Sequence, residues 1–142
     1  MSVWREVQET LYQRWAANWL DGSDPKTPYV FENDPFDPPN APWVRFSVRR
    51  MPGGPGTLGR TGTRKMDRVG RVFIQLFEPP GAGVGRSSDL AEDAAKIFEG
   101  CRLLSDHDIR FAEVEPGSAG DIENGRWWGV VVEGRFDYED II

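Results

Sequence analysis

Two short stretches of the sequence decide the fold of this chain. They read WVRFSVRRM at residues 43–51 and VGRVFIQLF at residues 69–77. Apolar and polar residues alternate in both, which is typical of strands that bury one side. The apolar positions that share a side are Val44, Phe46 and Val48 in the first stretch and Val72, Ile74 and Leu76 in the second. The sequence therefore predicts two antiparallel strands joined as a hairpin.

The connection between these strands, residues 51–67, contains five glycines and two prolines and almost nothing apolar. A connection this long without structure of its own is uncommon in a compact domain and is often functional. From Arg49 to Arg71 there are seven basic residues and one acidic residue, whereas the rest of the chain carries a net charge of −12. We therefore expect a long basic hairpin loop and a molecule with two electrically different parts.

Two helices are predicted outside the hairpin. Residues 3–20 place an apolar residue at every fourth position, which is the pattern of an amphipathic helix. These residues are Val3, Val7, Leu11, Trp15 and Trp19. A second helix is expected at about 88–100, with Ser88 or Asp89 as its N-cap. Its buried stripe is predicted to be Leu90, Ala94, Ile97, Phe98 and Cys101.

Three further strands complete the expected fold. They lie at residues 29–32, 109–114 and 127–138, and a proline-braced loop with Phe36 as an anchor follows the first. In the last, Trp128, Val130, Val132, Phe136 and Tyr138 share one side. The resulting order predicts an α+β fold: a mainly antiparallel mixed sheet packed against two helices that cover one face.

Composition limits the class of protein. The chain has 142 residues and seventeen aromatic side chains, so we expect a single folded domain over residues 1–142. One cysteine excludes an intramolecular disulfide, and one histidine argues against a histidine-rich metal site. No signal-peptide core or membrane-spanning run is expected. The net charge of −6 argues against nonspecific nucleic-acid binding by the whole molecule.

Two motifs resemble catalytic or binding signatures, but neither satisfies one. PGAGVGRS at residues 80–87 has Pro80 and Arg86 where a phosphate loop needs glycine and lysine. SDHD at residues 105–108 joins a hydroxyl, an imidazole and carboxylates, but neighbours in sequence rarely form a catalytic triad. We therefore expect no catalytic residue, cofactor or metal, and a hydrolase that uses His107 remains the weakest alternative.

The basic loop allows three interpretations. It could be a solubilising loop, a nucleic-acid contact, or a docking element that becomes ordered on assembly. No aromatic residues are interleaved with its arginines, which weakens the nucleic-acid reading. The docking element is favoured, and a small nucleic-acid-binding module is kept as an alternative.

Several segments together resemble the tail terminator, or tail completion, proteins of long-tailed bacteriophages. The resemblance is carried by YVFENDPFDPP (29–39) before WVRFSV (43–48), and by GRVFIQLFEPPGAG (70–83) before SDLAEDAAKIF (88–98). It covers residues 5–100 well, and the last third of the chain matches only in pattern.

The resemblance implies a structural virion protein that is not an enzyme. Such proteins form a homo-oligomeric ring, usually a hexamer, that caps the tail tube and terminates its polymerisation. The ring then provides the surface for the head–tail connector protein. The implied location is the head-proximal end of the tail, after assembly in the host cytoplasm, with incidental DNA contact in the lumen. Another head–tail neck or connector protein is the alternative within this class.

A ring is built from head-to-tail contacts, which suit a chain whose charges are separated. We expect Arg60, Arg64, Lys65 and Arg68 to approach acidic positions on a neighbouring subunit or on the tube. The acidic group Glu133, Asp137, Glu139 and Asp140 is the expected partner within the ring. Arg49 and Arg50 complete the predicted interface.

Overall fold

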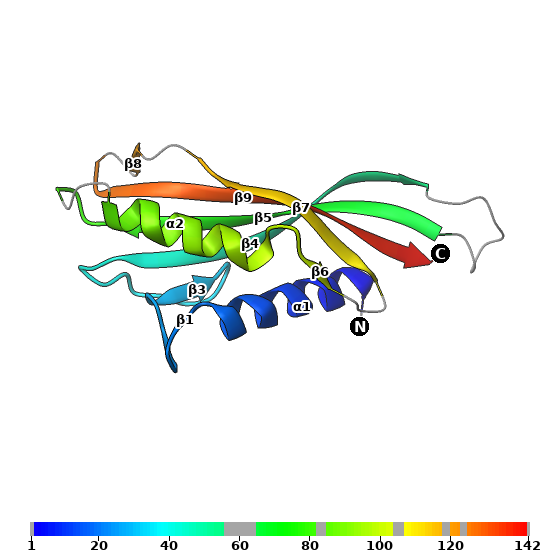
Figure 1. Ribbon diagram of the computed structural model, residues 1–142, viewed down its shortest axis with the longest axis horizontal. Coiled ribbons are helices and arrows are strands. Elements are labelled where there is room, and N and C mark those ends of the chain that lie inside the picture. The colour runs from blue at the N-terminus through cyan, green and yellow to red at the C-terminus, as the bar shows by residue number, and fades with distance from the viewer. Residues whose placement is uncertain are drawn as a thin grey trace.

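The computed structural model describes residues 2–55, 65–81, 85–103, 107–117, 120–122 and 125–141. The helices are α1 (Val3–Asn18) and α2 (Gly85–Phe98). The strands are β1 (Leu20–Asp21), β2 (Asp24–Pro25), β3 (Tyr29–Phe31), β4 (Trp43–Pro55), β5 (Lys65–Glu78), β6 (Arg102–Leu103), β7 (Ile109–Pro116), β8 (Gly120–Ile122) and β9 (Trp127–Ile141). One sheet has the order β3-β4-β5-β9-β7-β6, with β8 paired to β9. Figure 1 shows both helices on the same side of this sheet.

This arrangement confirms the α+β prediction and the mainly antiparallel mixed sheet. β3 pairs with β4 in parallel, whereas the pairs along β4, β5, β9 and β7 are antiparallel. The short β1–β2 hairpin, β6 and β8 were not predicted. Each has only two or three residues, which is too short to show an alternating pattern. β8 lies between the strands predicted at residues 109–114 and 127–138, where no strand was expected.

Helix α1 forms where the four-residue spacing predicts it. The Ser2 hydroxyl caps the helix by accepting a hydrogen bond of 3.2 Å from the Arg5 N–H. Val7, Leu11 and Trp15 are fully buried on its inner side. Trp19 follows the last turn, and its indole N–H donates to the Thr27 carbonyl at 3.1 Å. This bond fixes the chain as it turns back toward β3.

The hairpin of β4 and β5 is longer than its alternating pattern indicates. Strand pairing continues through a register shift between Met51 and Gly54, and the last pair is Pro55 with Met66. The predicted loop bounds of 51–67 were therefore too wide, because residues 51–55 and 65–67 are in strands. Backbone pairing needs no apolar side chains, so the alternation ends before the strands do. Residues 56–64 lie outside the described part.

Strand β9 joins the hairpin along its whole length, from the pair Glu78–Trp128 to the pair Lys65–Ile141. Beyond the body of the molecule, β4, β5 and β9 continue together as a three-stranded extension (Figure 1). We call this extension the arm; it comprises residues 50–55, 65–70 and 136–141. β9 is the longest strand, as predicted from its Trp-rich and Val-rich sequence.

The main core lies between the helices and the sheet. It contains the predicted inner residues of both hairpin strands, together with Val130, Val132, Phe136 and Tyr138 of β9. Phe46 is at its centre, stacked on Trp15 at 5.3 Å and on Phe98 at 5.6 Å between ring centroids. α1, α2 and the sheet therefore meet at one aromatic side chain.

The second helix differs from its prediction at both ends. It begins at Gly85, so Ser88 and Asp89 lie within it and neither is the N-cap. It ends at Phe98, and Cys101 lies beyond it, partly buried against the core. The sequence pattern was misleading because the chain turns at Gly100, where φ is +64°, and then enters β6.

A second, smaller apolar cluster covers the other face of the sheet near the start of β4. Trp43 stacks on Phe77 at 4.1 Å, and Trp127 packs edge-on against Trp43 at 6.0 Å. Phe36 of the proline-braced loop contacts Trp43 at 5.0 Å, as expected of an anchor, although it is 37% exposed. The guanidinium of Arg45 lies over the Trp43 ring at 5.3 Å. The loop thus closes one end of the open sheet face.

Glu78, at the end of β5, carries a buried carboxyl group. It is 2% exposed, and neither carboxylate oxygen has a hydrogen-bond partner within the described ranges. Burial raises the pKa of Glu78, and Arg86 opposes this shift more weakly. A buried charge without hydrogen bonds is costly.

We predict that Glu78→Gln changes the pH dependence of stability. With a folded-state pKa above the unfolded value, the folded state binds more protons, so stability falls as pH rises above about 4.5. The free energy of unfolding of the wild-type protein should therefore fall between about pH 4.5 and neutral pH, whereas that of the variant should fall less. Urea unfolding of both proteins at the two pH values measures the difference, because all other carboxylates are common to both. Parallel pH slopes would contradict a penalty at Glu78.

Candidate interaction surface

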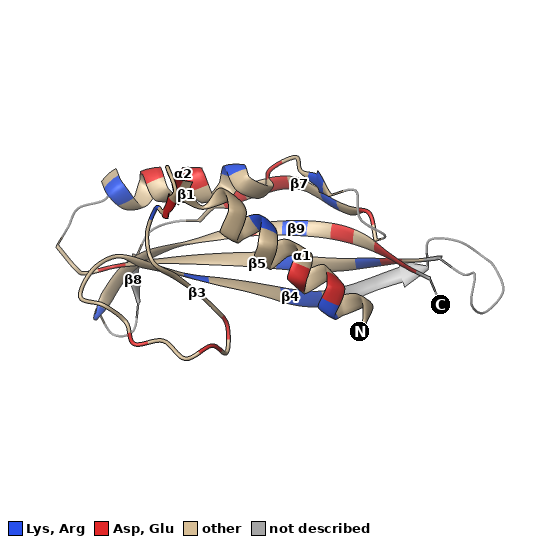
Figure 2. Cartoon of the chain, turned by 90° about the horizontal axis from the view of Figure 1, so that it is seen from below, with Lys and Arg blue, Asp and Glu red and all other residues tan. Residues whose placement is uncertain are grey.

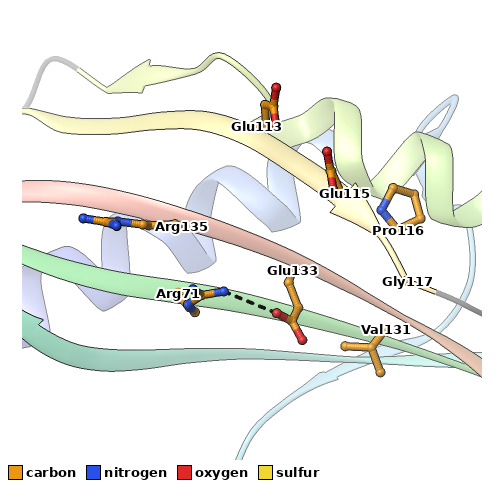
Figure 3. Close-up of a pocket in the computed structure, with 8 residues that line it drawn as sticks. All are labelled: Arg71, Glu113, Glu115, Pro116, Gly117, Val131, Glu133 and Arg135. Carbon is orange, nitrogen blue, oxygen red and sulfur yellow. Dashed lines mark hydrogen bonds and ion pairs between the residues drawn. The ribbon is translucent and has the colours of Figure 1, made fainter.

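The sheet face away from the helices is open beyond the aromatic cluster and carries rows of charged residues. Figure 3 views this face, with the helices behind the strands. Strand register places side chains from neighbouring strands in rows across it. One row contains Arg49 of β4, Arg71 of β5 and Arg135 of β9, each directly opposite the next. We call these three residues the arginine row.

Each member of the arginine row contacts one carboxylate of its own chain. Arg49 pairs with Glu32. Arg71 lies 3.4 Å from Glu133, and Arg135 lies 3.6 Å from Asp137. The Arg71 Nε also lies 3.1 Å from the Met51 sulfur. These contacts hold the side chains in place, yet those of Arg49 and Arg135 are 59% and 62% exposed.

Acidic residues lie on both sides of the arginine row. On the side of the body, Glu133 of β9 is opposite Glu115 of β7. On the side of the arm, Asp67 of β5 is opposite Glu139 of β9. The open face is therefore striped, with a basic row between acidic rows.

A hollow of about 550 Å³ lies beside the arginine row. Arg71, Glu133 and Arg135 form one wall, and Glu113 and Glu115 of β7 form the other (Figure 3). The hollow is shallow and polar, and its lining has charges of both signs. Such a surface suits contact with another charged surface rather than enclosure of a small apolar ligand.

The helix side of the arm has a second group of charges. Arg50 lies over the Trp4 ring at 5.4 Å, and Trp4 stacks on Phe136 at 6.4 Å. Arg68 lies 3.4 Å from Asp140 across the β5–β9 pair. Figure 2 shows basic segments of β4 and β5 next to acidic segments of β9 toward this end. Trp4 thus joins α1 to the base of the arm.

The structure brings together some of the sequence-predicted interface residues. Arg68 and Asp140 form an ion pair within the chain, so these two predicted partners meet without a neighbour. Arg49 and Arg50 are on opposite faces of β4. Arg60 and Arg64 lie outside the described residues, and Lys65 is described only by its backbone as the first residue of β5.

Sequence reasoning did not single out Arg71 and Arg135, or Glu113 and Glu115, which line the hollow of the candidate surface. Arg71 was visible only as the last member of a basic segment. The other three are distant in sequence from that segment, and only the pairing of β5, β9 and β7 places them beside it. No local motif could have revealed the row.

His107, the residue of the weakest alternative, connects three elements. Its Nε2 lies 2.6 Å from a Glu6 carboxylate oxygen of α1, and its Nδ1 lies 3.2 Å from the Glu139 carbonyl oxygen of β9. Its own carbonyl accepts a hydrogen bond of 2.7 Å from the Glu139 N–H. Asp108 forms an ion pair with Arg102 at 2.8 Å. Ser105 and Asp106 lie outside the described residues. The observed contacts are those of a structural histidine.

The glycine-rich motif of residues 80–87 is divided between two elements. Gly81 has φ +90° in the turn after β5, residues 82–84 are outside the described part, and residues 85–87 begin α2. Across the described ranges, no group of three or more His, Cys, Asp or Glu side chains is placed to hold a metal ion. Neither α1 nor α2 is long and apolar enough to span a membrane.

The structure defines a small α+β protein whose sheet has one face covered by two helices and one open, charged face. Comparison with protein families gives a match to the phage tail terminator protein family over residues 3–136. The chain therefore belongs to the phage tail terminator family, a family of structural tail proteins, which confirms the resemblance noted in the sequence.

Ten chains of solved structures match this fold, and one of them illustrates the likeness. It has 18% sequence identity and a TM-score of 0.65, and the match covers 97% of this chain and 96% of that chain. At this identity the likeness concerns the fold alone. No curated protein matches the sequence.

Proposed function

We propose that this protein caps the end of the phage tail tube as a ring, most simply a hexamer, and thereby terminates tail polymerisation. Family membership over residues 3–136 is the observation that carries the proposal. On this proposal the capping is steric, because a ring on the open end of the tube denies the next tube subunit its landing surface. The free side of the ring would then receive the head–tail connector protein. No catalytic step is required.

The shape of the molecule supports this role. A compact body with a three-stranded arm offers two separated surfaces, as a head-to-tail ring contact requires. Charges are present on both faces of the sheet where the body meets the arm, with the arginine row on the open face and Arg50 and Arg68 on the helix side. An enzyme would instead be expected to have an enclosed cavity with convergent polar groups.

We further propose that basic residues of the hairpin meet acidic residues of a neighbouring subunit. Arg60, Arg64 and Lys65 are the proposed donors, and Glu133, Asp137 and Glu139 are the proposed acceptors. Glu133 and Asp137 already contact arginines of their own chain. Exposed pairs between subunits would therefore contribute only about 0–1 kcal/mol each. Apolar and backbone contacts must supply the rest of the ring interface.

The proposal predicts that tail tubes stop growing at a shorter length when the protein is added to polymerising tube subunits. We expect tube length, measured by electron microscopy, to fall as the concentration of the protein rises, with a ring at one end of each tube. Native mass spectrometry of the same preparation should show a closed ring, on its own or at the tube end. Tubes that keep growing with the protein bound only to connector would favour a neck or connector role instead.

A further inference from the structure

We propose that the arginine row on the open sheet face is a docking surface for a carboxylate-bearing surface at the end of the tail tube. The inference rests on the proposed function and adds the surface and the chemistry of the partner. Arg49, Arg71 and Arg135 form a line across three adjacent strands. Figure 3 shows Arg71 and Arg135 on the face that the helices leave uncovered, and the side chain of Arg49 is 59% exposed.

The arginine row brings three like charges together, and the isolated subunit offsets each of them with a single ion pair among the described residues. Like charges directly opposite one another on a sheet are destabilising, and Arg71 has an arginine opposite it on both sides. Arg71 has one carboxylate partner in the described part of the chain, Glu133, at 3.4 Å, and both side chains of this pair are exposed to solvent. Exposed pairs contribute little. Weak exposed pairs of this kind are readily exchanged for carboxylates of a partner, so the row is a suitable place for one to dock.

The partner is expected to be a protein rather than a nucleic acid. Phosphates spaced along a nucleic-acid strand would meet the acidic rows on either side of the arginines, at Glu115 and Glu133 and at Asp67 and Glu139. A protein surface can instead present carboxylates to the basic row and basic groups to Glu115 and Asp67, the acidic positions that are not assigned to the neighbouring subunit. Such complementarity favours the correct partner and the correct register.

The test uses Arg71→Gln, which removes the central charge of the row. Binding to tail tubes, assembled from the tube protein of the same phage, should weaken by about tenfold. The melting temperature of the free chain should stay nearly the same, because relief of the repulsion from Arg49 and Arg135 offsets the loss of the exposed pair with Glu133. Lys96→Gln is the matched control, since Lys96 is exposed on α2 in the helix layer and the charge change is the same. It should bind like wild type.

A second experiment tests whether the partner groups on the tube are carboxylates. Tubes whose carboxylates have been amidated with a carbodiimide and glycinamide should lose binding to wild type. The Arg71→Gln variant should respond less to this treatment, because one of its contacts is already absent.

Four results would overturn the inference. They are equal binding of Arg71→Gln and wild type; a lower melting temperature that explains the weaker binding; unchanged binding to amidated tubes; and tight binding to a short DNA duplex that depends on Arg71. The last would favour nucleic-acid contact. If wild-type protein fails to bind tubes at all, the proposed function fails together with the inference, whereas equal binding by the variant rejects the inference alone.

Discussion

Replacement of Gly70 by alanine should destabilise the protein by about 3 kcal/mol, the upper end of the usual cost of overpacking a core. Gly70 of β5 is directly opposite Phe136 of β9, and the ring lies over the glycine. A Cβ atom built on Gly70 would be 2.2 Å from the tip of that ring. The ring cannot move aside easily, because Phe136 is fully buried and contacts Trp4 and Phe111. Chemical denaturation of the purified variant measures the loss.

Two further variants make the Gly70 prediction specific. Gly85→Ala is the control, because nothing lies within 4 Å of a Cβ at this first position of α2, and alanine is the better helix former. It should be neutral or stabilising. Combining Gly70→Ala with Phe136→Leu should cost less than the sum of the two single changes, since the smaller side chain removes the clash. Full additivity would show that the glycine is needed for some other reason.

The sequence predicted the elements that have a strong period. α1 and the central parts of β4, β5 and β9 bury one side, so burial forces apolar residues into a regular spacing that can be read. The ends of the hairpin could not be read in this way. Residues 51–55 and 65–67 extend the strands through glycines and prolines by backbone pairing, which leaves no pattern in the side chains.

The first residue of α2 could not be predicted from the sequence for a different reason. Ser88 and Asp89 are good N-cap residues, but the helix begins three residues before Ser88, at Gly85. Ser87 is consequently inside the helix and fully buried. Capping preference is worth about 1 kcal/mol, and the packing of six buried helix residues against the core outweighs it. Tertiary contacts therefore decide the boundary.

The candidate surface was predictable only in part. The basic character of the hairpin is visible in the composition, and Arg49, Arg50 and Arg68 were identified from it. The arginine row additionally needs Arg135, which is 64 positions from Arg71 and reaches it only through the β5–β9 register. Register depends on which residues face the core in three dimensions, so a single sequence without a structure cannot supply it.

Truncation of Trp15 to alanine should have the other large effect, a loss of about 3–5 kcal/mol of folding free energy. Trp15 is fully buried where α1 meets the sheet. Its ring stacks on Trp19 at 4.6 Å and on Phe46 at 5.3 Å, with Tyr29 edge-on at 6.0 Å. Alanine would leave a cavity among three rings that are held by other contacts and cannot collapse into it.

Trp15→Phe separates the aromatic stack from the indole N–H. The Nε1 of Trp15 is buried without a hydrogen-bond partner in the described part of the chain, so its removal relieves an unsatisfied donor while an aromatic ring remains. We therefore expect Trp15→Phe to cost well under half as much as Trp15→Ala in urea unfolding. Equal losses for the two variants would mean that the indole ring is held by a bond or a shape that phenylalanine cannot replace. Near-neutral behaviour of Trp15→Ala would mean that α1 does not depend on this stack for its attachment to the sheet.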